Sequence, residues 1–169
     1  HVMLRLVRAL VAGCRAEPSL NAWYDSEKIG RWVLQKVDIG VAVDTPDGLL
    51  VPVVRNAESR SLDDLKQGLE RLIADARARK VPPEELRGNT ITLSNYGTIV
   101  GRYASPVVLP PTVAILGAGR IDKQVVVVDD QPAVRRMLPL SLTFDHRVVT
   151  GGEAGRFLKA VIADLQRAE

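Results

Sequence analysis

The most constraining feature of the sequence is an apolar strand pattern that leads into a capped helix, over residues 138–166. Leu138 to Phe144 is almost continuously apolar, and from Gly151 to Gln166 the apolar residues recur at helical spacing. Thr150 stands at the predicted N-cap with Glu153 three residues later, which is the pattern of a capping box. A helix with this cap anchors the short connection before it, and that connection contains His146.

The rest of the chain alternates short strands with two further helices. One helix is predicted over Met3 to Ala16, and another runs from a Ser61 cap, with Asp64 in the capping-box position, into a basic cluster. Strands are predicted at 21–25, 31–35, 37–44, 49–54, 90–94, 112–117, 124–129 and 134–144, with a hairpin turn at 129–132 and a short helical turn at 82–86. The irregular connection 101–111 is apolar enough that we expect it to pack against something. The pattern predicts one α/β domain of the α+β type, a mixed sheet with helices packed on one face.

Composition excludes several classes of protein. At 169 residues and 46% hydrophobic content, the chain can bury a real core. The net charge of +3, with few aromatic residues, suits an anionic small molecule or an acidic partner and gives little support for nucleic-acid binding. Cys14 is the only cysteine, so we expect no internal disulfide, no metal site and a reducing compartment. No apolar run reaches membrane-span length, and no secretory signal is visible.

Three motifs leave alternatives open when they are taken alone. His146 is the only internal histidine, and it is either a structural hydrogen-bonding group or the residue that moves protons near neutral pH. The cluster Arg77, Arg79 and Lys80 complements a helix dipole or binds phosphate, and we favour the dipole. Gly117-Ala118-Gly119 is a weak dinucleotide motif, because the third glycine and the following helix pattern are missing.

Several segments together resemble a known family. DHRVVTGG after the strand MLPLSLTF resembles the active-site signature of the acyltransferase core of 2-oxo acid dehydrogenase complexes, which chloramphenicol acetyltransferase shares more distantly. ITLSNYGTIVG, SPVVLPPTVAILGAGRI, LNAWYD and VDIGVAVDTPDGLLVPVV match further stretches of that family in unbroken order. The resemblance implies a chloramphenicol acetyltransferase-like fold and a dihydrolipoamide acyltransferase, most similar to the branched-chain type.

The resemblance also implies roles for particular residues. His146 would be the general base that deprotonates a thiol, and Ser94 would donate a hydrogen bond to the oxyanion of the tetrahedral intermediate. Asn95 and Gly97 would line the pocket for coenzyme A, which is a substrate. The remaining site residues would be structural: salt bridges of Asp145 and Arg147 hold the loop, and Gly151, like Gly97, allows close approach of the backbone. In relatives the histidine and the serine meet across a trimer interface, so a homotrimer is expected.

This sequence departs from the family pattern at three places. Thr150, which we include among the candidate catalytic residues, stands where Asp or Asn is usual. Threonine is also a competent cap, so the loop can survive, but a carboxylate that could orient an arginine or stabilise the imidazolium is missing. Residues 1–169 read as a single catalytic core that lacks the family's first strand and helix, with the lipoyl and partner-binding domains absent. The polar end Asp164–Glu169 differs from the apolar tail of relatives that form large cores, so assembly beyond a trimer stays open.

The resemblance implies a set of partners. The lipoyl group would arrive on a separate domain, and the decarboxylase and dihydrolipoamide dehydrogenase components would complete the complex. Neither nucleic acid nor membrane is expected, and the location would be the bacterial cytoplasm, or the mitochondrial matrix in a eukaryote. The main alternative is a weakly active or inactive scaffold component of the same complex. A third reading is acetylation of an antibiotic hydroxyl, which shares the histidine motif but not the Pro-Pro strand.

Overall fold

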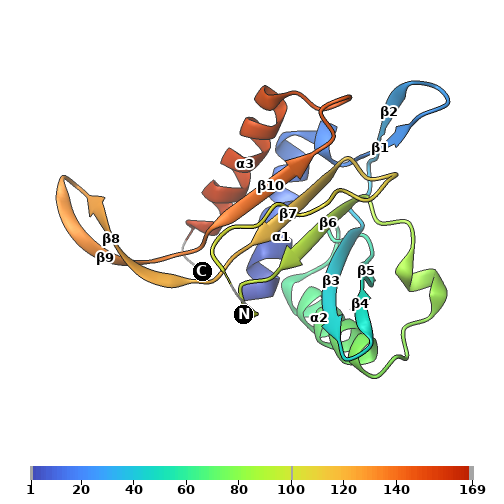
Figure 1. Cartoon of the computed structure of the whole chain (residues 1–169), viewed down its shortest axis with the longest axis horizontal. Coiled ribbons are helices and arrows are strands. Elements are labelled where there is room, and N and C mark those ends of the chain that lie inside the picture. The colour runs from blue at the N-terminus through green and yellow to red at the C-terminus, as the bar shows by residue number, and fades with distance from the viewer. Residues whose placement is uncertain (1, 100, 168–169) are drawn as a thin grey trace.

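A six-stranded mixed sheet forms the centre of the molecule (Figure 1). The computed structural model describes residues 2–99 and 101–167. The strands lie in the order β10 (Leu140–Phe144), β7 (Ala114–Ala118), β6 (Ile91–Asn95), β3 (Ile39–Thr45) and β4 (Gly48–Leu50), with β5 (Val53–Val54) also paired to β3. The inner pairs β3–β6 and β6–β7 are parallel, whereas β10 and β4 pair antiparallel to their neighbours. Strand β6 is therefore central, and its first three residues are buried.

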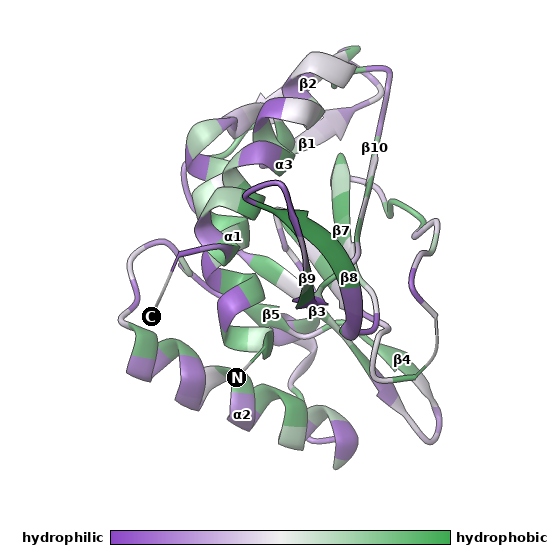
Figure 2. Ribbon diagram, turned by 90° about the vertical axis from the view of Figure 1, so that its left-hand side faces the viewer, coloured by the Kyte–Doolittle hydropathy of each residue, from purple (hydrophilic) through white to green (hydrophobic). Residues whose placement is uncertain are grey.

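Three α-helices lie on one side of this sheet (Figures 1 and 2). They are α1 (Val2–Ala16), α2 (Leu62–Arg77) and α3 (Gly151–Leu165), and short 3-10 helices occupy Pro18–Leu20 and Pro83–Leu86. Helices α1 and α3 pack closely because Gly13 has no side chain: a Cβ there would lie 2.7 Å from Cγ2 of Val161 and 2.8 Å from Cε2 of Phe157. Phe157 is fully buried at this contact. The predicted mixed sheet with helices on one face is confirmed.

The prediction of one strand over residues 134–144 is wrong. The chain forms β9 (Gln131–Met137), which pairs with β8 (Asp122–Val128) in a separate two-stranded ribbon, and only then β10. Pro139 separates the two strands, and proline has no N–H to donate to a sheet. The predicted hairpin turn is confirmed, with positive φ at Asp129 and Asp130 as in tight two-residue hairpin loops.

The ribbon projects from the body of the molecule (Figure 1), and the part of β8 that contains its valines is hydrophobic (green in Figure 2). Val125, Val127 and Val134 are 72%, 75% and 60% exposed. An isolated two-stranded hairpin is at best marginally stable in water. The ribbon thus presents an apolar surface that the described part of this chain does not cover.

Three smaller predictions also need correction. Residues 49–54 do not form one strand, because Pro52 has no N–H to donate and separates β4 from β5, each of which pairs with β3. The connection 101–111 is irregular as predicted, and Pro106 packs on β7, where a Cβ at Gly117 would lie 3.1 Å from its Cγ. Within one chain, however, Val107 and Leu109 are 74% and 60% exposed, so the expected packing is incomplete. Ser61 accepts from the backbone N–H of Asp64 at 3.2 Å, whereas the carboxylate of Asp64 pairs with Arg60. That helix start therefore has half of the predicted capping box.

The structure also bears on the environment of Cys14 and on the question of membrane-spanning helices. Cys14 is buried in the core, as its place in an apolar helical pattern predicts, and burial raises the pKa of its thiol. None of the helices in residues 2–99 and 101–167 is long and apolar enough to cross a membrane.

Candidate active site

His146 lies in a tight turn that follows β10. The N–H of Asp145 donates to the carbonyl of Val113 at 2.8 Å, and the carbonyl of Asp145 accepts from the N–H groups of Val148 and Val149 at 3.1 and 3.0 Å. The backbone on both sides of the histidine is therefore tied to the sheet. The imidazole itself is exposed, with its ring centroid 5.4 Å from that of Phe144.

The two charged neighbours of His146 hold the turn, as predicted. A guanidinium nitrogen of Arg147 lies 2.6 Å from the carboxylate of Asp145. Hydrogen bonds from Arg147 hold the pKa of Asp145 below its usual range, so the carboxylate is ionised at neutral pH. The guanidinium also lies 4.0 Å from the ring centroid of Tyr24, which belongs to β1 (Ala22–Asp25). The predicted structural salt bridge of Asp145 and Arg147 is confirmed.

Thr150 and Glu153 form the predicted capping box at the start of α3. The hydroxyl of Thr150 accepts from the N–H of Glu153 at 3.3 Å and donates to its carboxylate at 2.9 Å. The N–H of Thr150 donates to the same carboxylate oxygen at 2.7 Å. The hydroxyl is thus occupied in the cap. Gly151 follows at the first helical position, where an added Cβ would meet nothing within 4 Å, so the expected close backbone approach at Gly151 is wrong.

The sequence reasoning missed a further residue of this region, Arg31. It belongs to β2 (Gly30–Val33), which pairs antiparallel with β1, and it donates to the carboxylate of Glu153 at 2.8 Å. With the N–H of Thr150, this contact lowers the pKa of Glu153 to about 2. No motif or spacing links Arg31 to residues more than a hundred positions later, so only the tertiary structure identifies the pair.

Ser94 lies near the end of the central strand β6. It is half-buried and pairs with Ala42 of β3 on one side and Gly117 of β7 on the other. Asn95 ends the strand, and the N–H of Gly97 donates to the carbonyl of Ala118 at 3.1 Å. A Cβ at position 97 would lie 2.2 Å from a backbone oxygen, so the close approach predicted for Gly97 is confirmed.

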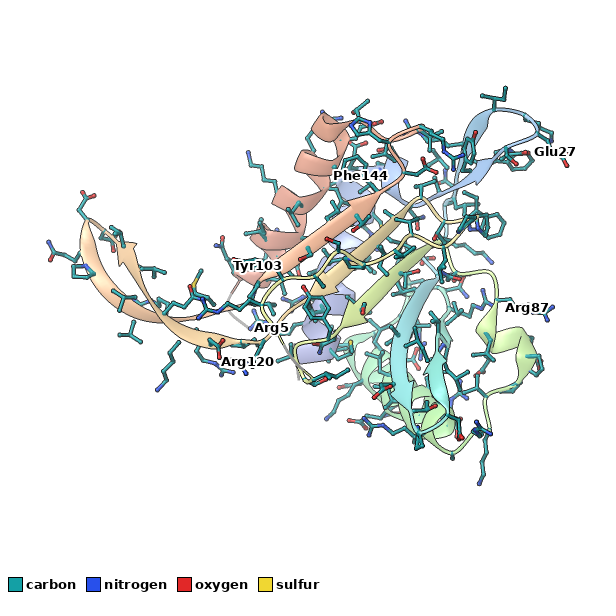
Figure 3. The ribbon with its side chains drawn as sticks, viewed as in Figure 1. Arg5, Glu27, Arg87, Tyr103, Arg120 and Phe144 are labelled. Atoms are coloured by element: carbon teal, nitrogen blue, oxygen red, sulfur yellow. The ribbon has the colours of Figure 1, made fainter. Side chains whose placement is uncertain are left out.

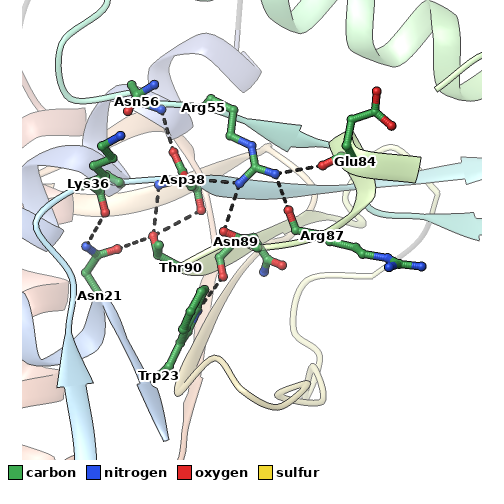
Figure 4. A network of polar contacts seen from close by, with 12 residues as sticks. Asn21, Trp23, Lys36, Asp38, Arg55, Asn56, Glu84, Arg87, Asn89 and Thr90 are labelled. Carbon is green, nitrogen blue, oxygen red and sulfur yellow. Dashed lines mark hydrogen bonds and ion pairs between the residues drawn. The ribbon is translucent and has the colours of Figure 1, made fainter. Parts of the chain in front are cut away.

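A buried polar network sets the register of β6 at its other end (Figure 4). The hydroxyl of Thr90 donates to the side chain of Asn21 at 2.5 Å and accepts from the N–H of Asp38 at 3.0 Å. The carboxylate of Asp38 pairs with Arg55 at 3.2 Å. Thr90 and Asn21 are buried, and buried polar groups need such partners. The network joins β6 to the start of β3 and thereby fixes where Ser94 lies.

Ser94 and His146 lie at opposite ends of the sheet within one chain. Ser94 is opposite Gly117 of β7, whereas Phe144 is opposite Ala114, and His146 continues beyond that end. Three residues along a strand and two strand spacings separate the Cα atoms of Ser94 and Phe144 by roughly 14 Å, and His146 is farther still. Figure 3 shows Phe144 near one end of the sheet and Arg120, which follows β7, toward the other. A single chain therefore does not bring the two predicted catalytic residues together.

The residues described by the structure contain no group of three or more His, Cys, Asp or Glu side chains that could hold a metal ion.

The comparison with protein families is decisive for the whole chain: residues 1–169 match the 2-oxoacid dehydrogenases acyltransferase (catalytic domain). The chain belongs to this acyltransferase family.

Relatives of the family are similar over most of this chain. It is 44% and 45% identical, over 92% of its length, to the lipoamide acyltransferase components of the branched-chain alpha-keto acid dehydrogenase complexes of Pseudomonas aeruginosa and Pseudomonas putida. The chain spans 36% and 37% of the length of these two relatives.

Solved structures agree with the family assignment. A dihydrolipoamide acetyltransferase of Azotobacter vinelandii has a TM-score of 0.93 and 37% identity, covering 98% of this chain and 68% of that one. Its structure was determined to investigate the role of a serine, a histidine 52 positions later and an asparagine four positions after that in the catalytic mechanism. The cubic core of a pyruvate dehydrogenase multienzyme complex is 38% identical at the same TM-score, over 98% of this chain and 68% of that one. A chloramphenicol acetyltransferase, with a TM-score of 0.62 and 18% identity, covering 98% of this chain and 78% of that one, shares the fold.

Proposed function

We propose that this domain transfers an acyl group between the lipoyl group of dihydrolipoamide and coenzyme A, as a component of a 2-oxo acid dehydrogenase complex. The observation that carries the proposal is a matched spacing. Ser94 precedes His146 by 52 positions and Thr150 follows it by four, which are the separations of the serine, histidine and asparagine studied in the Azotobacter enzyme.

His146 is proposed as the general base. A free thiol has a pKa near 8.5, so at neutral pH coenzyme A or dihydrolipoamide is mostly protonated and a poor nucleophile. The imidazole takes the proton, and the thiolate attacks the carbonyl carbon of the acyl thioester. A positioned general base accelerates such a step by roughly 10²–10⁴-fold. The exposed imidazole on a turn that is tied to the sheet suits this role.

Ser94 is proposed as the donor to the oxyanion. Attack on the thioester carbonyl gives a tetrahedral intermediate whose oxygen carries negative charge, and a hydroxyl aimed at that oxygen stabilises it. Loss of one such donor raises the barrier by roughly 3–4 kcal/mol. When the intermediate collapses, the other thiolate leaves and takes the proton back from His146. Asn95 and Gly97 are proposed to shape the pocket around the substrate.

We further propose that His146 of one subunit acts with Ser94 of another in a homotrimer. The two side chains are too far apart within one chain to reach a common carbonyl group. Two copies can place the turn of one beside the β6 end of the other, and closed symmetric assemblies are the usual form of homo-oligomers.

The proposed acyl group is branched, because the two branched-chain relatives are 44% and 45% identical to this chain. The proposed partners are a lipoyl domain, a decarboxylase and a dihydrolipoamide dehydrogenase, and the proposed location is the bacterial cytoplasm. One methylene in an apolar pocket changes binding by only about 1–3 kcal/mol, so acetyl and isobutyryl groups need direct comparison.

Acyl transfer from acetyl-CoA and isobutyryl-CoA to free dihydrolipoamide tests the proposal. We expect turnover with both donors, faster with isobutyryl-CoA, and a loss of roughly 10²-fold or more in the His146→Ala variant. An assembled, folded protein without turnover would indicate a scaffold component. Acetylation of an aromatic amino-alcohol antibiotic in place of dihydrolipoamide would instead indicate the third reading of the histidine motif.

A further inference from the structure

Arg31 connects strand β2 with the turn that contains His146 and with the first turn of α3. Its guanidinium donates to the carboxylate of Glu153 at 2.8 Å and to the backbone carbonyl of Val148. Val148 is two residues after His146, and Glu153 is in the first turn of α3. The side chains of Arg31 and Glu153 are 28% and 14% exposed, so the contact is partly shielded from water.

The carboxylate of Glu153 also accepts hydrogen bonds from Thr150, the N-cap residue of α3. One of its oxygens accepts from Arg31, and the other accepts from the N–H and the hydroxyl of Thr150 at 2.7 and 2.9 Å. One carboxylate therefore ties β2 to the residue that ends the His146 turn. A planar guanidinium that bonds a carboxylate and a carbonyl at once restricts the orientation of both.

The same hairpin also contacts the other side of the turn. Tyr24 of β1 lies beneath the guanidinium of Arg147, and Arg147 in turn holds Asp145. The residues directly before and after His146 are thus held through β1, and the residues farther along the turn are held through β2. Because β1 and β2 are one antiparallel hairpin, both supports come from a single element.

We propose that Arg31 and Glu153 are positioning residues that hold the His146 imidazole in its reactive orientation, with the β1–β2 hairpin as their support. The inference rests on the proposed function. It also explains how threonine can stand at position 150: the carboxylate that would orient an arginine beside the histidine is supplied by Glu153, one helical turn farther along the chain.

The test compares three variants with one matched control. Arg31→Ala removes both contacts, and Glu153→Gln removes the charge. Arg31→Lys keeps a cation for Glu153 but cannot bond the carboxylate and the carbonyl together in one plane. The control is Arg156→Ala, which breaks an ion pair of the same helix, with Glu17 at 2.7 Å, and leaves the bonds of Arg31 and Glu153 in place. Each variant is assayed for transfer from acetyl-CoA to dihydrolipoamide and for the ring signals of ¹⁵N-labelled histidine, assigned by their loss in His146→Ala.

We expect Arg31→Ala and Glu153→Gln to lower kcat by between about tenfold and a hundredfold with little change in KM for acetyl-CoA, because a misplaced base still permits binding. Arg31→Lys should lie between them and the wild type. The His146 ring signals should shift or broaden in these variants and not in Arg156→Ala.

Unchanged His146 signals in Arg31→Ala and Glu153→Gln would overturn the proposal, as would equal changes in the control. If Arg31→Ala does not fold, the signals of Arg31→Lys and Glu153→Gln decide in the same way. An inactive wild-type protein whose His146 signals nevertheless respond to Arg31 would overturn the proposed function and still support the positioning role.

Discussion

The hydroxyl group of Thr150 makes two hydrogen bonds within the cap of α3. It accepts from the N–H of Glu153 and donates its only proton to the carboxylate of the same residue. The departure from Asp or Asn at this position therefore preserves the helix cap. At the residue scale, the turn that contains His146 is therefore anchored by the Thr150–Glu153 cap.

The cap predicts the effect of substitutions at position 150. Thr150→Ala should lower the free energy of unfolding by about 1 kcal/mol, because the N–H of Glu153 loses its acceptor. Thr150→Ser keeps the hydroxyl and should stay within about 0.5 kcal/mol of the wild type. Urea unfolding at one fixed protein concentration measures both, and an equal loss in the two variants would contradict the capping role.

The lowered pKa of Glu153 predicts that the free energy of unfolding depends on pH. The contacts with Arg31 and Thr150 lower its pKa from 4.5 to about 2 in the folded protein. The ionised carboxylate therefore stabilises the fold above pH 4.5, and this contribution is lost as the pH falls from 4.5 toward about 2. The difference in free energy of unfolding between the wild type and Glu153→Gln should shrink over that range. A constant difference across the range would show that Glu153 does not titrate in this way.

The close contact of α1 with α3 controls how the three-helix layer sits on the sheet. Glycine has low helix propensity, so Gly13 within the last turn of α1 would ordinarily be unfavourable. Here it allows Phe157 and Val161 of α3 to approach the α1 backbone, where a Cβ would overlap both side chains. At the scale of elements, packing therefore outweighs local propensity, and α3 is held in the place from which its cap anchors the His146 turn.

Two glycine substitutions separate packing from propensity. Gly13→Ala should destabilise the protein by about 1–3 kcal/mol through overpacking, although alanine favours a helix by about 1 kcal/mol. Gly155→Ala, in α3, meets nothing within 4 Å and should stabilise the protein by about 0.5–1 kcal/mol. Thermal or urea unfolding of both variants provides the measurement. Stabilisation by Gly13→Ala would mean that the helices are not in close contact.

The two proposed catalytic residues, Ser94 and His146, lie at opposite ends of the sheet within one chain. Ser94 is fixed by the central strand and its polar network, and His146 is fixed by the strand at the edge. Neither is on a segment that the hydrogen bonds leave free to cross the sheet. At the scale of the molecule, the site that we propose therefore needs a second copy of the chain.

Mixing two inactive variants tests the shared site. Ser94→Ala and His146→Ala should each be inactive alone, but subunits exchanged at equal amounts should recover about a quarter of the wild-type rate, because a random pairing joins both intact side chains about one time in four. The assay is acyl transfer after refolding the variants together. Recovery should be absent when each variant is refolded separately, and absence in the mixture as well would contradict a site shared between subunits.

The amino-acid pattern alone determined the elements whose cause is local. The Thr150 cap with Glu153, the apolar stripe of α3 and the two-residue turn at Asp129 depend on residues a few positions apart, so spacing was enough to predict them. Local spacing does not show where a continuous apolar run leaves one sheet for another. For that reason the single strand predicted at 134–144 was wrong.

The long-range contacts were decided only by the tertiary structure. The pairing of Arg31 with Glu153, the support of Arg147 by Tyr24 and the closeness allowed by Gly13 join segments far apart in the sequence. The separation of Ser94 from His146 also follows from strand order, which depends on how six strands bury their apolar faces together. Residue types determine which groups are able to react, but the energy of packing the whole sheet determines which of them can meet.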